Sequence, residues 1–99
     1  MASANTGQVQ LTGYLEVPPD RLAAVIQALP DHIALTRAEP GCISFEVVPS
    51  PQDATRFLVC ELFVDQAAFD AHQQRAGASA WARVTAGLPR HYTVTTATP

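Results

Sequence analysis

The run RFLVCELFV, residues 56–64, predicts a strand that is apolar on both of its faces. Its residue types favour extended backbone, in which successive side chains point to opposite sides of a sheet. Apart from Arg56 at its start, Glu61 is the one charge in the run. A strand with two apolar faces is buried on both sides. Both faces of the sheet must therefore be covered at this strand. Helices of so small a domain can cover only one of them, so the other needs a partner.

Three further segments alternate between apolar and polar residues, or are rich in β-branched residues, and predict strands. They are residues 8–17, 42–48 and 91–96. In the second of these, Ile43 falls on the same side as Phe45 and Val47. Gly13 falls on the apolar side of the first, which predicts space for something bulky above the sheet.

Helical spacing of apolar residues predicts helices between these strands. The first begins near Pro19 and must end by Glu39, because Pro40 and Gly41 follow. Pro30 should kink this helix or split it in two. Its expected apolar stripe is Leu22, Val25, Ile26, Leu29, Ile33 and Thr36. Two shorter helices are expected after Asp65 and from about Ser79.

The resulting order, βαββαβ, predicts an α+β ferredoxin-like fold: a four-stranded antiparallel sheet with helices on one face. A chain of 99 residues forms one domain. We expect a flexible tail at residues 1–7 and a single domain at residues 8–97. The sheet face without helices, together with a charged fraction of only 15%, predicts a homodimer in which two sheets pack face to face.

Charge and hydropathy exclude several classes of partner. The net charge is −3, and the six basic residues are scattered, so nucleic-acid binding is not expected. No apolar run approaches the roughly 18 residues of a membrane span. The first residues lack the pattern of a secretory signal, which predicts a cytoplasmic protein. Cys42 and Cys60 lie in apolar runs without a CxxC motif, and we expect two buried thiols.

Two segments resemble the antibiotic biosynthesis monooxygenase family. They are HIALTRAEPGCISF, residues 32–45, and FLVCELFVDQAAFDAH, residues 57–72. The resemblance implies a dimeric α/β barrel with a pocket in each subunit between helices and sheet. Known members include cofactor-free oxygenases of quinols and polyketide-type phenols, and haem-degrading enzymes. Phe63 stands where the haem-degrading members carry Trp, which argues against haem. The sequence has no nucleotide-binding loop and no cluster of metal ligands, so we expect no cofactor and no metal.

The resemblance also implies a set of site residues. His72, on the apolar face of its helix, would be the catalytic base, since imidazole accepts protons near neutrality. The residues expected to bind substrate are Arg37, Glu61, Phe63, Phe69 and Trp81. Each also has a structural interpretation: a core histidine, a helix-end arginine, a paired carboxylate, or packed aromatic rings. His32 and His91 are expected at the surface.

The favoured function is a cofactor-independent monooxygenase that oxidises a small phenolic or quinol-type aromatic with molecular oxygen. One alternative is a dimeric domain without catalytic activity that binds a small apolar metabolite. A second is an isomerase or lactone-processing enzyme, because related dimeric barrels support such reactions. The sequence does not identify the substrate.

Overall fold

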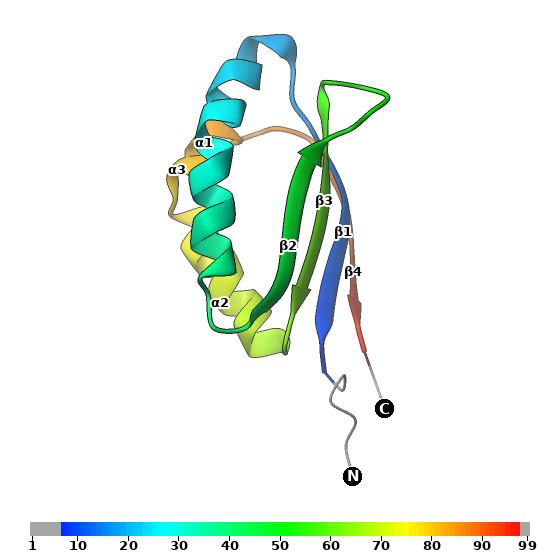
Figure 1. Cartoon of the computed structure of the whole chain (residues 1–99), viewed down its shortest axis with the longest axis vertical. Coiled ribbons are helices and arrows are strands. Elements are labelled where there is room, and N and C mark those ends of the chain that lie inside the picture. The colour runs from blue at the N-terminus through cyan, green and yellow to red at the C-terminus, as the bar shows by residue number, and fades with distance from the viewer. Residues whose placement is uncertain (1–6, 98–99) are drawn as a thin grey trace.

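Four strands and three helices follow one another along residues 7–97, which are the residues that this computed structural model describes (Figure 1). In chain order they are β1 (Val9–Glu16), α1 (Pro19–Arg37), β2 (Cys42–Pro49), β3 (Arg56–Phe63), α2 (Gln66–Gly77), α3 (Ala80–Val84) and β4 (Arg90–Thr96). This is the predicted βαββαβ order. Of the predicted tail at residues 1–7, all but Gly7 lies outside the described residues.

The strands form one antiparallel sheet in the order β2-β3-β1-β4, with the helices on one of its faces (Figure 1). The ferredoxin-like fold is thereby confirmed. In the central strand β3, alternate residues from Phe57 to Phe63 point toward the helices and are buried. Leu58, on the opposite face, is 40% exposed. We call that opposite face the outer face.

The two cysteines are less buried than expected. Cys60 is exposed on the outer face, and Cys42 is partly buried. The prediction of two buried thiols is wrong for the single chain, because β3 has a covering layer on its helix side only.

Local signals explain where the helices begin. Proline occupies the first turn of α1, and its fixed φ angle suits that position. The Asp65 side chain accepts a hydrogen bond from the Ala68 N–H at 2.8 Å and caps α2. Pro30 does not split α1, which is a single helix over 19 residues. Its exposed ring lies on the solvent side, where the helix loses little beyond one backbone hydrogen bond.

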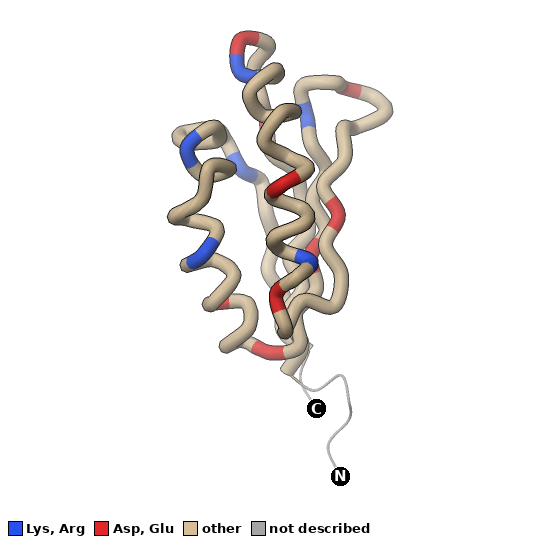
Figure 2. Tube along the Cα trace, turned by 60° about the vertical axis from the view of Figure 1, so that its left-hand side comes forward, with Lys and Arg blue, Asp and Glu red and all other residues tan. Residues whose placement is uncertain are grey.

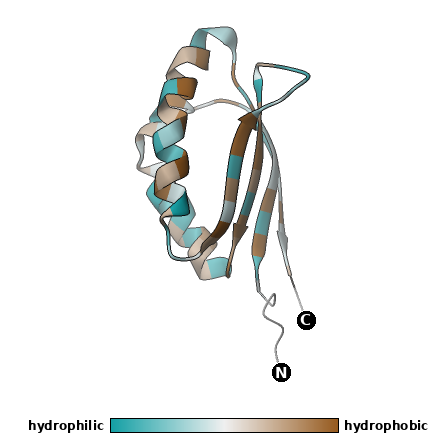
Figure 3. Cartoon of the chain, viewed as in Figure 1, coloured by the Kyte–Doolittle hydropathy of each residue, from teal (hydrophilic) through white to brown (hydrophobic). Residues whose placement is uncertain are grey.

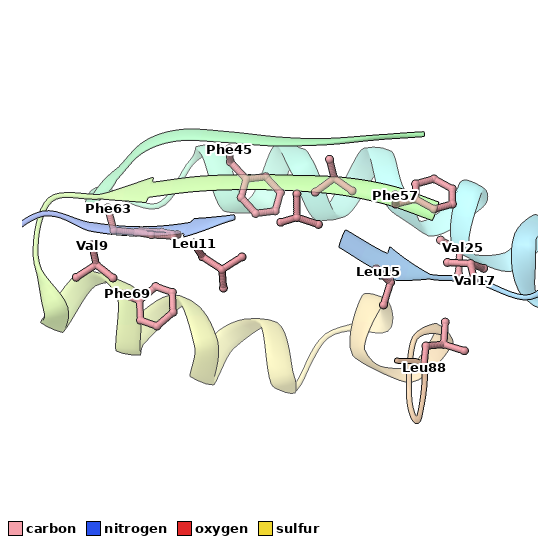
Figure 4. Packing of buried hydrophobic residues seen from close by; sticks show 12 residues of the cluster. Val9, Leu11, Leu15, Val17, Val25, Phe45, Phe57, Phe63, Phe69 and Leu88 are labelled. Carbon is pink, nitrogen blue, oxygen red and sulfur yellow. The ribbon is translucent and has the colours of Figure 1, made fainter. Parts of the chain in front are cut away.

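The core lies between the sheet and the helices, as the labelled side chains in Figure 4 show. Leu11 and Leu15 of β1 point into it from the sheet, and Phe69 and Leu88 meet them from the helical layer. The other members are Val9, Val17, Val25, Phe45, Val47, Phe57, Val59 and Phe63. Figure 3 shows polar residues alternating with apolar ones along β1, as a half-buried strand requires.

Two residues of the strands differ from expectation. Ile43 is 46% exposed, because the β2–β3 register shifts between Cys42 and Ser44 and turns the intervening side chain outward. Gly13 has a positive φ of 147°, and a Cβ there would lie 1.9 Å from the His91 carbonyl oxygen. The close approach of the β4 backbone therefore requires this glycine.

Charged residues are distributed over both layers rather than gathered in a block of one sign (Figure 2). Between residues 7 and 97, no helix combines the length and apolar composition that crossing a membrane requires.

Candidate functional site

A pocket of about 300 Å³ lies between the helical layer and the sheet. Side chains from β1, α1, β3, α2, α3 and β4 line it: Leu11, His32, Glu61, His72, Gln73, Ala76, Gly77, Trp81, Ala82, Arg90 and Tyr92. Three of the predicted site residues, Glu61, His72 and Trp81, are therefore brought together around one cavity. Polar and apolar side chains line it in similar measure, and a site of this size suits a small organic molecule that carries polar groups.

His72 is held by a carboxylate that the sequence analysis did not single out. Its Nδ1 lies 3.2 Å from both oxygens of Glu39. Arg75 donates from Nε to Glu39 and from a terminal nitrogen to Oγ1 of Thr36 at 3.0 Å. Because a carboxylate only accepts hydrogen bonds, Nδ1 of His72 carries the proton and Nε2 presents a lone pair. Burial lowers the pKa of His72, against the opposing effect of Glu39.

Glu61 faces this histidine across the pocket wall. Its Oε1 lies 3.8 Å from Nε2 of His72, too far for a hydrogen bond, and has no hydrogen-bond partner within the described part of the chain. The residue is only 6% exposed. Burial, with a smaller contribution from the charge of Glu39, raises the pKa of Glu61 to about 7. This carboxyl group therefore changes protonation state near neutral pH.

His32 forms the aromatic wall of the pocket with Trp81. The two rings are stacked, with centroids 4.6 Å apart and planes 4° from parallel. His32 is 6% exposed, so its predicted surface location is wrong. Burial, followed by the charges of His72 and Arg75, lowers the pKa of His32 to about 4. Its Nδ1 has no hydrogen-bond partner among residues 7–97.

The remaining predicted residues lie outside the pocket lining. Phe63 is fully buried behind His72, with ring centroids 4.9 Å apart, and Phe69 packs edge-on against it at 5.7 Å. Arg37 extends along β2, where it donates to the Phe45 carbonyl oxygen at 3.0 and 3.1 Å and to Glu46 at 2.9 Å. The two phenylalanines thus support the histidine, while Arg37 is engaged at the surface.

The sequence matches the family model described as antibiotic biosynthesis monooxygenase over residues 9–84. The chain belongs to this family. Solved structures support the assignment. A Shewanella oneidensis protein is 30% identical, with 96% of this chain and 93% of that chain covered and a TM-score of 0.71. A Nitrosomonas europaea protein, described as a proposed antibiotic biosynthesis monooxygenase, is 25% identical. The match covers 89% of this chain and 95% of that chain, with a TM-score of 0.76.

One curated relative is an uncharacterised protein of Synechocystis sp., 32% identical over 66 residues. The aligned part covers 67% of this chain but 45% of that protein. The chain thus matches less than half the length of this relative.

Several residues that line the pocket or hold His72 were missed by sequence reasoning. Glu39 lies within the segment that carries the family resemblance, and Arg75 lies three residues after His72 on the same helix face. Both could have been found from these positions. Arg90 and Tyr92 carried no such signal, because only the β1–β4 register places them beside Gly13 and Leu15 on the helix side. Burial raises the pKa of Tyr92 to about 12.

The pocket offers proton transfer beside an aromatic wall. Glu61 and the lone pair of His72 can accept protons, and the stacked rings of Trp81 and His32 line the same cavity. Within residues 7–97, no three His, Cys, Asp or Glu side chains are arranged as metal ligands.

Proposed function

We propose that this chain is a cofactor-independent monooxygenase that oxidises a small phenolic or quinol-type aromatic with molecular oxygen. The observation that carries the proposal is the buried pair of His72 and Glu61, which faces an aromatic-walled pocket. Family membership supports it, since the matching family model is named for this activity.

The proposed reaction needs little from the protein beyond binding, deprotonation and exclusion of water. An electron-rich hydroxyaromatic that has lost its proton can pass an electron to oxygen directly. In the oxidation of a phenol to a quinone, one atom of O₂ enters the ring and the other leaves as water. The facing pair of Glu61 and His72 would take up the hydroxyl proton between them, and Trp81 with His32 would line the space for the ring.

Oxygen uptake tests this proposal. A panel of hydroquinones and dihydroxynaphthalenes is offered without added flavin or metal to the wild type, to His72→Gln and to Gln74→Ala. Gln74 is an exposed residue of the same helix and serves as the matched control. We expect uptake above the spontaneous rate that falls at least about tenfold in His72→Gln only. Uptake that is unchanged in His72→Gln, or absent with every compound, contradicts the proposal and favours a binding domain.

We also propose that the functional unit is a homodimer that packs outer face to outer face. Leu58 and Val48 point from β3 and β2 to this face and are 40% and 46% exposed. Tyr14 lies beside them, between the guanidinium of Arg56 at 4.7 Å and the stacked ring of His91 at 4.6 Å. A second sheet packed on this face would remove its apolar side chains from water.

A further inference from the structure

We propose that Glu61 is the catalytic residue that contacts a hydroxyl group of the ligand and accepts its proton, while His72, fixed by Glu39, is a positioning residue that shares that proton. The inference deepens the proposed function and rests on it for the hydroxyaromatic class of ligand. It exchanges the roles expected from the sequence, in which His72 is the base and Glu61 binds substrate.

The first support is the way in which two hydrogen-bond acceptors face each other. The hydrogen bond from Nδ1 of His72 to Glu39 leaves Nε2 with a lone pair directed to the Glu61 side. The ionised Glu61 carboxylate offers only lone pairs in return. Two acceptors that face each other at 3.8 Å cannot bond. One added proton turns this contact into a hydrogen bond after a closure of less than about 1 Å.

The second support is the burial of Glu61 at the pocket. The side chain comes from a central strand and is 6% exposed, with Oε1 lacking a hydrogen-bond partner among the described residues. An unpaired buried acceptor is costly, so native proteins seldom keep one without a functional reason. A carboxylate has two oxygens. Glu61 can therefore face His72 with Oε1 and accept a ligand hydroxyl with Oε2.

His72 is less suited to direct contact. Its ring is 2% exposed and is enclosed by Phe63 at 4.9 Å and Phe45 at 5.7 Å. Glu39 is bonded to Nδ1 of His72, and Glu61 lies next to Nε2, so both ring nitrogens already face a carboxylate and not a ligand. The histidine thus orients the acid and shares its proton rather than receiving a proton from the ligand.

The proton transfer balances without any further reactant. The O–H bond of the ligand breaks, its electron pair stays on the ligand oxygen, and the proton binds to the Glu61 carboxylate. The ligand becomes a phenolate with the proton on Oε2 of Glu61. Rotation of the protonated carboxyl group about its Cγ–Cδ bond then turns the O–H toward Nε2 of His72, to which it donates a hydrogen bond. No electron is transferred in this step.

The charges around Glu61 agree with this role. His32 of α1 has a pKa of about 4 and is neutral at pH 7, and Glu39 contributes a negative charge. On α2, burial lowers the pKa of His72, which favours its uncharged form, and Arg75 is paired with Glu39. From β4, the positive Arg90 and the un-ionised Tyr92 line the same pocket. With a pKa of about 7, Glu61 is ionised in a large fraction of molecules at neutrality.

A matched pair of ligands tests the inference without turnover. The compounds 4-methylphenol and 4-methylanisole share a ring, but the ether lacks the hydroxyl proton. Binding is followed without oxygen by the fluorescence of Trp81, the one tryptophan of the chain and a residue of the pocket wall. The wild type, Glu61→Gln and His72→Gln are compared at about pH 5.5 and about pH 8, on either side of the Glu61 pKa.

We expect the wild type to prefer the phenol at least about tenfold at the higher pH, because the ether leaves a charged acceptor unpaired. The preference should weaken at the lower pH. Glu61→Gln should lose this pH dependence, while His72→Gln should keep the preference and shift its midpoint.

A wild-type preference that survives in Glu61→Gln, or that disappears in His72→Gln alone, overturns the inference, as does a wild type that binds neither compound. The two proposals fail separately. Oxygen uptake that persists in Glu61→Gln removes the role of Glu61 and leaves the monooxygenase standing. A normal phenol preference without oxygen uptake removes the monooxygenase and leaves the binding role.

Discussion

Nε2 of His72 and Oε1 of Glu61 face each other at 3.8 Å inside the helix–sheet interface, with no other group of the described chain bonded to that oxygen. His72 is secured on its other side by Glu39, whereas Glu61 keeps a raised pKa. The buried, unpaired Glu61 carboxylate lowers the stability of the fold, but it titrates near neutral pH, as groups at sites of proton transfer commonly do.

Glu61→Gln should stabilise the protein increasingly as the pH rises. Folding raises the pKa of this carboxyl group from 4.5 to about 7. The folded state therefore has its full stability below about pH 4.5, where the group is protonated, and loses stability as the pH rises through about 7. The glutamine variant has no such loss. With about 1.4 kcal/mol per pKa unit, the stability difference should grow by roughly 3 kcal/mol between about pH 4.5 and pH 8. Urea denaturation at both pH values measures it, and a difference that does not change with pH would contradict the buried, unpaired state of Glu61.

His32→Phe should show the opposite trend. The pKa of His32 is lowered from 6.5 to about 4, so the neutral ring favours folding above pH 6.5 and this contribution is lost on acidification. Phenylalanine keeps the stack on Trp81 and cannot be protonated. Its stability relative to the wild type should rise by roughly 3 kcal/mol as the pH falls from about 7 to 4. Thermal denaturation at a series of pH values measures the trend, and a stability difference that stays constant from about pH 7 to about pH 4 would contradict it.

Gly13→Ala should destabilise the β1–β4 pairing severely. The added Cβ would lie 1.9 Å from the His91 carbonyl oxygen, and a φ of 147° is strained for alanine. We expect a loss of more than about 3 kcal/mol in the free energy of unfolding. Gly77→Ala is the matched control, because nothing lies within 4 Å of its Cβ position and it ends a helix. Equal stabilities of the two variants would refute the close approach of β4.

Leu58→Glu should prevent self-association. Leu58 lies on the outer face, where a charge would be buried without a partner in the proposed dimer. Sedimentation equilibrium at micromolar concentration should give a dimer for the wild type and a monomer for the variant. Leu35→Glu provides the control, because Leu35 is 52% exposed on α1, away from the sheet. A monomeric wild type, or a dimer lost equally in both variants, counts against the outer face as the interface.

Much of the fold could be predicted because its signals are local. The alternation in residues 8–17 and the cap at Asp65 act within a few residues, and both appear in the structure nearly at the predicted bounds. The errors arose where local signals do not decide. Val25, His32 and Thr36 form the buried line of α1, whereas Ile26 is 55% exposed. A histidine seven residues after Val25 could have been placed on that line, but its polarity argued for the surface.

The sequence by itself determined the element order, the two-layer fold and the family, because periodicity and motif depend on residue spacing alone. Only the tertiary structure decided which groups meet. Glu39 reaches His72 across 33 residues of chain, and β4 brings Arg90 and Tyr92 to the pocket through its pairing with β1. Such contacts depend on strand register and on the placement of α1 over the sheet, which the spacing of residues does not specify.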